Sequence, residues 1–201
     1  MKSLTVDQIE SARVKVLDNA RELVEEAELL LANRRFARAY ALSQLACEEM
    51  AKIPMLIRAA TDTLMGLEFD WPKLWKRLRS HHAKISGILF IDWLVDPNVD
   101  GDADLKRLKE DLANVANYNK LKNWSLYVDF SDDEFWKPSE LVSEDSATAF
   151  VKLGRSRLTF FETVELDTQG EIQRMVETPL FKELWKEQEG TRGKRGSAAL
   201  E

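Results

Sequence analysis

Apolar residues recur at helical spacing along the first part of the chain. One stripe has members seven residues apart: Ile9, Val16, Leu23 and Leu30. Acidic residues gather on the opposite side of the same stretch, as on a helix with one buried face. The pattern predicts a first helix over about residues 6–33, with Thr5 or Asp7 as its N-terminal cap.

The next stretch is apolar nearly all round from Phe36 to Ile57, which is typical of a helix at the centre of a bundle. We predict this second helix over about residues 34–64. A short connection, Asn33 to Arg35, links it to the first helix, so the two should form an antiparallel hairpin. Pro54 lies inside the second helix and has no backbone N–H, so the helix should kink or restart there.

Two further helices are predicted, over about residues 70–94 and 104–122. Asp70 caps the first of them, and the Asp96-Pro97-Asn98 stretch ends it. Residues 124–136 (WSLYVDFSDDEFW) then lose the helical period, and their β-branched and aromatic side chains favour extended structure. Because this segment is rich in aromatic residues, we expect it to pack along the bundle.

Helices over about residues 144–164 and 179–188 complete the pattern. The predicted fold class is all-α, an up-and-down helical bundle with one short extended aromatic segment. A chain of 201 residues with 44% hydrophobic residues suits a single domain, which we assign to residues 1–189. Residues 190–201 read as a disordered basic tail that ends in a vector-derived Gly-Ser-Ala-Ala-Leu-Glu.

Composition limits the function classes. A net charge of −6 argues against a general polyanion binder, although it allows a small basic site on an acidic body. The sequence contains no apolar run long enough to span a bilayer, and its first residues do not resemble a signal peptide. The one cysteine, Cys47, stands in an apolar stretch and is expected to be a buried hydrophobic residue. These features predict a soluble cytoplasmic protein.

The two histidines of the chain stand together in the predicted third helix. On one continuous helix, His82 falls in the apolar stripe and should point inward. His81 falls on an adjacent face, between Arg77 one turn before it and Lys84 about one turn after it. Imidazole and basic side chains are therefore expected to gather on one part of this helix.

Glu49 shares a face of the predicted second helix with apolar residues, so its carboxylate must find a partner or become protonated. The second and third helices should be neighbours in a bundle. Glu49 could then meet Arg77, His81 or Lys84 across their interface. Glu48 and Lys52 stand four residues apart, in the favourable order for a pair within the helix.

These residue types match the needs of RNA cleavage without a metal ion. A histidine can move the proton of the 2′-hydroxyl group, and basic side chains can stabilise the charge of the phosphoryl group. The candidate residues are Arg77, Arg79, His81, His82, Lys84 and Glu49. The alternative interpretation is structural: a hydrogen-bonded core histidine, a solvated basic face and a buried ion-pair partner. No cofactor or metal ligand set is predicted, because the sequence lacks a Glu-x-x-His pair, a Cys/His quartet and a glycine-rich phosphate loop.

Three segments in order resemble the AbiV-type abortive infection proteins of the HEPN class of helical bundles. The first is residues 36–52, with small residues followed by Glu48-Glu49 and Lys52. The second is residues 79–84, which resemble that family's Arg-x-His-x-x-Lys. The third is Leu126-Tyr127-Val128-Asp129-Phe130 with Trp136 and Pro138 downstream. The resemblance spans about residues 19–138.

The resemblance implies a HEPN-like bundle, commonly a homodimer, that acts in defence against phage by halting the growth of the infected cell. Many HEPN proteins are metal-independent ribonucleases with an arginine followed a few residues later by a histidine. Arg77 and His82 fit that spacing, whereas Arg79 and His81 fit the narrower family pattern, and the choice stays open. Other members are inactive binding modules. RNA, the translation machinery, and a phage-encoded or host regulator are therefore the expected partners.

Overall fold

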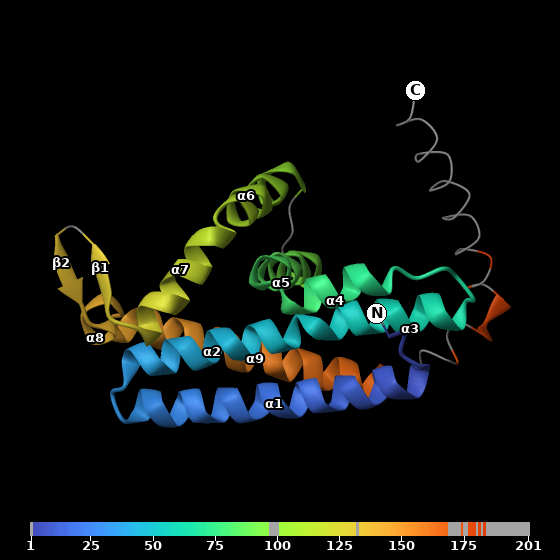
Figure 1. Ribbon diagram of the computed structural model, residues 1–201, viewed down its shortest axis with the longest axis horizontal. Coiled ribbons are helices and arrows are strands. Elements are labelled where there is room, and N and C mark those ends of the chain that lie inside the picture. The colour runs from blue at the N-terminus through green and yellow to red at the C-terminus, as the bar shows by residue number, and fades with distance from the viewer. Residues whose placement is uncertain are drawn as a thin grey trace.

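The computed structural model describes residues 2–96, 101–131 and 133–168, together with residues 174, 177–179, 181 and 183. The described chain is mainly helical, with one small antiparallel sheet (Figure 1), which confirms the predicted all-α class and its short extended segment. Seven of the ten residues of the predicted last helix, about residues 179–188, lie outside the described residues, and the tail 190–201 lies wholly outside them.

The elements follow one another along the chain as α1 (Val6–Ala32), α2 (Phe36–Met50), α3 (Lys52–Leu64), α4 (Trp71–Arg79), α5 (His81–Val95), α6 (Gly101–Ala113), α7 (Val115–Leu126), β1 (Asp129–Ser131), β2 (Glu134–Trp136), α8 (Pro138–Leu141) and α9 (Glu144–Thr168). None of the described helices combines the length and the apolar character needed to cross a membrane.

Helix α1 begins at a capping box. The side chain of Thr5 accepts a hydrogen bond from the backbone N–H of Gln8, and the side chain of Gln8 accepts one from the backbone N–H of Thr5. Thr5, rather than Asp7, is therefore the cap. At the other end Arg34 takes a left-handed conformation (φ 58°) in the tight turn to α2, and α1 and α2 form the predicted antiparallel hairpin (Figure 1).

The predicted restart near Pro54 is confirmed, and it takes the form of a division between α2 and α3 at Ala51. Since Pro54 has no N–H, it cannot donate to the carbonyl of Met50, and the hydrogen-bond ladder of α2 ends there. The two helices continue in nearly the same direction (Figure 1).

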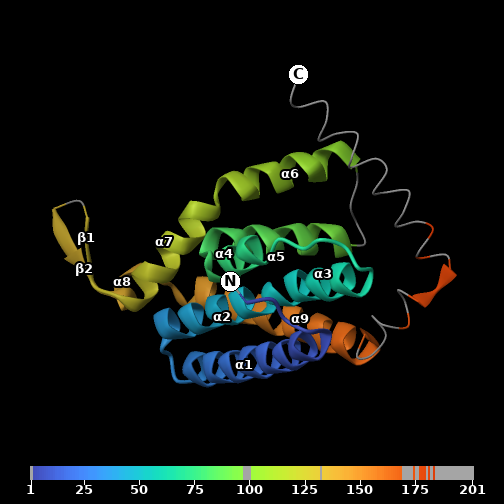
Figure 2. The same cartoon turned by 45° about the vertical axis from the view of Figure 1, so that its right-hand side comes forward.

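Helix α2 is central, as its nearly all-round apolar pattern predicts. It packs against α1 and α9 on one side and against α5 and α7 on the other (Figure 2). The buried core around it includes Val24, Ala46, Met50, Ile53 and Leu158. A close approach between α2 and α9 requires a glycine, because a Cβ atom at Gly154 would lie 2.4 Å from the Oγ atom of Ser43.

The predicted third helix is wrong in one respect that matters for the site: it is divided at Ser80 into α4 and α5, which run in different directions (Figures 1 and 2). Ser80 has an extended backbone, and its Oγ atom accepts a hydrogen bond from the N–H of Ala83 at 3.2 Å, so it caps α5. Residues of α4 and residues of α5 therefore do not share one helix face, as they would on a continuous helix.

The predicted fourth helix is likewise divided, at Asn114, and α7 continues to Leu126. The extended segment that follows is a hairpin in which Phe130 pairs with Phe135. The expectation that this segment packs along the bundle is wrong. The hairpin projects from one end of the molecule (Figure 1), and Phe135 is 71% exposed.

Candidate functional site

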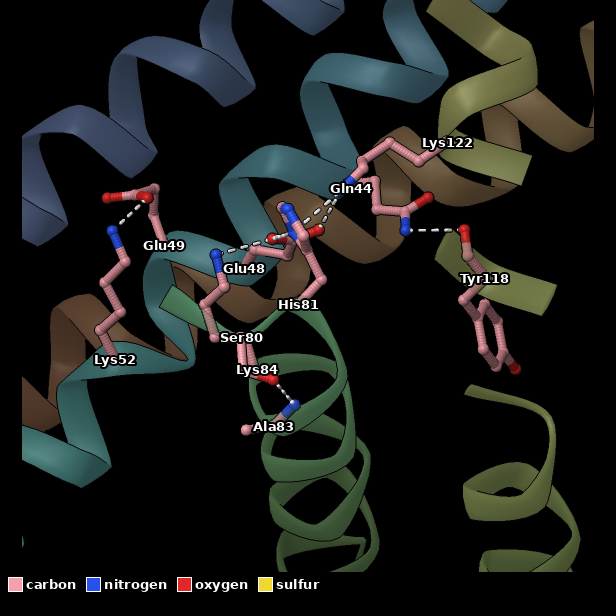
Figure 3. Close-up of polar contacts among 10 residues, drawn as sticks. All are labelled: Gln44, Glu48, Glu49, Lys52, Ser80, His81, Ala83, Lys84, Tyr118 and Lys122. Atoms are coloured by element: carbon pink, nitrogen blue, oxygen red, sulfur yellow. Dashed lines mark hydrogen bonds and ion pairs between the residues drawn. The ribbon is translucent and has the colours of Figure 1, made fainter. Parts of the chain in front are cut away.

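The buried carboxylate of Glu48, on α2, gathers three basic side chains from two other helices (Figure 3). Its Oε1 atom accepts a hydrogen bond from the Nζ atom of Lys122 at 2.7 Å. Its Oε2 atom lies 2.7 Å from the Nζ atom of Lys84 and 2.5 Å from the Nδ1 atom of His81. Side chains from α2, α5 and α7 thus meet at one carboxylate.

Local sequence explains why these side chains converge. Because Ser80 begins α5, His81 and Lys84 stand three residues apart in its first turn and share one side of the helix. On α7, Lys122 stands at the spacing of the buried residues Val115 and Ser125, so its stem enters the interface with α2. Both lysines are buried, whereas the side chain of His81 is 49% exposed.

The proton of the His81 ring is assigned from the groups around Nδ1. Its Nδ1 atom lies 2.5 Å from a carboxylate oxygen of Glu48 and 2.9 Å from the Nζ atom of Lys122. Because a carboxylate oxygen can only accept, we assign the proton of the neutral ring to Nδ1, which then donates to Glu48. The approach of Lys122 to the same nitrogen is then a contact between two donors and not a hydrogen bond. The Nε2 atom then keeps its lone pair, and it has no hydrogen-bond partner within the described residues.

The charges of this cluster do not cancel. Burial by itself would raise the pKa of Glu48, but hydrogen bonds from Lys122, Lys84 and His81 outweigh it and hold the pKa of that carboxyl group below its usual value. One negative charge therefore faces two buried ammonium groups before His81 is protonated. The excess positive charge makes the exposed side of the cluster favourable for an anion.

The cluster contains only some of the residues that the sequence predicts for the site. His81 and Lys84 do come together, as expected. Glu49 does not join them: its Oε1 atom lies 2.5 Å from the Nζ atom of Lys52, a pairing that the sequence had assigned to Glu48. The expected contact of Glu49 with the basic residues of the next helix is therefore wrong, because the neighbouring residue, Glu48, faces that interface.

The other three candidates lie apart from the cluster. His82 is exposed rather than inward, because Ser80 restarts the helix just before it. The Nε atom of Arg79 donates to the backbone carbonyl of Trp75 at 3.1 Å. Arg77 is exposed and lines a different cleft, of about 530 Å³, between α3, α4 and α5.

Sequence reasoning missed Glu48 and Lys122. A signal for Lys122 existed in its spacing from Val115 and Ser125, which places a lysine on the buried side of α7. For Glu48 the sequence offered no such signal, because α2 is apolar on nearly every side. Within the described residues, no group of three or more His, Cys, Asp or Glu side chains is arranged to hold a metal ion.

A model of a known protein family matches most of the chain. The model of the AbiV family, named HEPN_AbiV, matches residues 8–159, which is more than half of the chain and includes every residue of the Glu48 cluster. Neither the curated proteins nor the solved structures contain a match. The arrangement itself can move a proton at the Nε2 atom of His81 and attract an anion to the same place.

Proposed function

Because this chain belongs to the AbiV family of abortive-infection HEPN proteins, we propose that it is a growth-arresting ribonuclease whose site is the Glu48 cluster. The observation that carries the proposal is the pairing of His81 with Glu48. It leaves the Nε2 atom of an exposed imidazole as a base, next to buried positive charge.

The reaction that fits this geometry is attack of a ribose 2′-oxygen on the adjacent phosphorus. Nε2 of His81 takes the 2′-hydroxyl proton, the new O2′–P bond forms, the P–O5′ bond breaks, and the proton passes on to O5′. The products are a 2′,3′-cyclic phosphate and a 5′-hydroxyl end. Glu48 stabilises the imidazolium that exists between these proton transfers, and Lys84 and Lys122 supply positive charge near the phosphoryl oxygens.

The test is cleavage of total cellular RNA by the purified protein in the presence of a chelator. We expect fragments with 2′,3′-cyclic phosphate ends. His81→Ala should lower the cleavage rate by about 10²–10⁴-fold, the usual contribution of a general acid–base group. His82→Ala is the matched control, because His82 is an exposed neighbour outside the cluster, and it should cleave normally. Full activity in His81→Ala would refute the site.

A second copy of the chain is part of the proposal. On the surface of α5, Phe90, Leu94 and Val95 are exposed apolar side chains, and Arg77 lines the cleft beside Phe90 and Leu94. Pairing through this face would cover the apolar residues and add basic side chains to a shared surface. Sedimentation analysis should give a dimer, and Leu94→Glu should shift it to a monomer.

The second candidate is an interaction module that arrests translation by binding the translation machinery or a partner protein. It is supported by the projecting hairpin, whose exposed aromatic side chains include Tyr127, Phe130 and Phe135. Intact RNA together with co-sedimentation of the protein with ribosomes would favour this function. Phe130→Ser combined with Phe135→Ser would then abolish the co-sedimentation while leaving the helices folded.

A further inference from the structure

A cleft of about 320 Å³, here called the basic cleft, lies between the start of α2 and the start of α8. These two segments lie side by side at one end of the molecule (Figures 1 and 2). The volume falls within the range of about 300–1,000 Å³ found for small-molecule sites. On a chain of net charge −6, a local surplus of positive charge favours an anionic partner. Among the described residues that line the basic cleft none is acidic and four are basic: Arg34, Arg35, Arg38 and Lys137.

The basic side chains of the cleft are only partly neutralised by their surroundings. All four are exposed, and neither Arg35 nor Arg38 forms an ion pair with a described residue. Arg34 meets Glu144 across 3.6 Å, in an exposed pair that contributes little. Glu140 accepts a hydrogen bond from the backbone N–H of the lysine at 2.7 Å. Four positive charges thus stand against two nearby carboxylates, and an excess of positive charge faces solvent.

Arg34 holds a backbone conformation that does not suit its residue type. Its φ of 58° falls directly after the C-terminal cap of α1, at a position that glycine or asparagine usually takes. A Cβ atom makes this left-handed conformation less stable, so glycine would form the turn at lower cost. The turn therefore does not call for an arginine, whereas the basic cleft gains a guanidinium from it.

The chemistry of the lining favours a phosphodiester chain over an acidic peptide. Planar guanidinium groups bind phosphate through paired hydrogen bonds. The half-buried ring of Phe36 lines the same cleft, and the guanidinium carbon of Arg34 lies 5.7 Å from its centre. Basic grooves that also present aromatic rings are typical of surfaces that bind single-stranded nucleic acid, because each phosphate comes with a flat base that can stack. The N-terminal end of α2, which has no side-chain cap, adds to the positive potential.

We propose that the basic cleft binds the phosphodiester backbone of single-stranded RNA at a place separate from the Glu48 cluster. The inference rests on the proposed ribonuclease function for the identity of the ligand and adds a second contact with it. Phe36 and Glu48 stand twelve residues apart on α2, which corresponds to about 18 Å along the helix axis. A single nucleotide at His81 therefore does not reach the basic cleft, and only a longer RNA contacts both.

The test measures binding of a fluorescently labelled 2′-O-methyl oligouridylate to the full chain by anisotropy. The probe is longer than the site sizes of about 4–16 nucleotides found on single-strand binding surfaces, and without a free 2′-hydroxyl group it is not cleaved. Arg35→Gln combined with Arg38→Gln should weaken binding roughly tenfold and reduce the slope of log Kd against log salt concentration by about 1.4, or about 0.7 for each lost phosphate contact. The matched control is Lys106→Gln combined with Lys109→Gln, which makes the same change of charge on the exposed side of α6 and should alter neither quantity.

Arg34→Gly separates a binding role from a structural one. It removes the guanidinium and gives the left-handed position the residue that suits it. The variant should therefore melt at or above the temperature of the wild-type chain and still bind the RNA more weakly. A lower melting temperature with unchanged RNA binding would show that Arg34 serves only the turn, and would count against the basic cleft.

The outcomes separate this proposal from the catalytic one. Equal loss of binding in the two double variants overturns the basic cleft, because general attraction of charge would then explain the binding. Unchanged binding in the variant of Arg35 and Arg38 also overturns it, and capture of polyglutamate by the cleft instead would assign it to an acidic protein. Binding that depends on the cleft, without cleavage of natural RNA, supports the cleft and refutes the catalytic assignment. Cleavage that depends on His81, with binding independent of the cleft, does the reverse.

Discussion

Two sides of helix α2 are held by different forces. Toward α1 and α9 the contacts are apolar and close, as at Leu158 and at the approach of Gly154 to Ser43. Toward α5 and α7 the centre of the interface is a carboxylate surrounded by basic groups. The apolar side is sensitive to changes of side-chain volume, whereas the charged side depends on every member of its cluster. The proposed catalytic site lies on the side where charged contacts, rather than close apolar packing, hold the helices together.

The largest effect is expected at Glu48. Glu48→Ala leaves the ammonium groups of Lys84 and Lys122 buried without their carboxylate and should lower the free energy of unfolding by about 3–5 kcal/mol. Glu49→Ala is the control, because the pair of Glu49 with Lys52 is partly exposed and should contribute at most about 1 kcal/mol. Urea unfolding measures both. Equal losses would mean that the Glu48 cluster is no stronger than a surface pair.

On the apolar side, Leu158→Ala removes a fully buried side chain from the interface of α9 with α2. The cavity and the lost burial should lower the free energy of unfolding by about 2–5 kcal/mol. Unlike the loss at Glu48, this loss should be the same at pH 4 and pH 7, since no titrating group is removed. A strong pH dependence of the Leu158→Ala effect would contradict the division between the two sides.

Acid should act selectively on the charged side. The fold lowers the pKa of Glu48, so its contribution to stability is complete above its unfolded value of 4.5 and is lost as pH falls through the lower folded value. Glu48→Gln lacks that contribution at every pH. The difference in unfolding free energy between the wild-type chain and Glu48→Gln should therefore shrink below about pH 4.5. A constant difference down to pH 3 would show that the charge of Glu48 is not what stabilises the interface.

The smallest effect is expected in the hairpin. Phe135 is exposed and packs mainly on Phe130, so Phe135→Ser should change the free energy of unfolding by no more than about 0.5 kcal/mol. A loss above about 2 kcal/mol would mean that the hairpin belongs to the cooperative core after all. Thermal denaturation is sufficient for this measurement.

The helices and the restart near Pro54 could be predicted because each has a local cause: apolar spacing, the capping box at Thr5, and a residue without an N–H. The candidate site could be predicted only in part. His81 and Lys84 stand close in sequence and on one helix, so their proximity follows from spacing.

The remaining parts of the site could not be predicted, for physical reasons. Helix α2 is apolar on most sides, so periodicity cannot decide whether Glu48 or Glu49 faces the basic helices. Lys122 comes from α7, and no local rule states which residue of a distant helix reaches a given carboxylate. The inward placement of His82 failed because a serine with helical residues on both sides can still end one helix and cap the next.

The break between α4 and α5 at Ser80 affects which residue spacings can vary among related chains. A spacing between an arginine and a histidine measures a distance in space only when one helix carries both. Here a turn could be added to α4 or removed from it without displacing His81, because Ser80 sets the start of α5 independently of what precedes it. The count of residues from Arg77 or Arg79 to either histidine is then free to drift, while the interval from Ser80 to Lys84 is not.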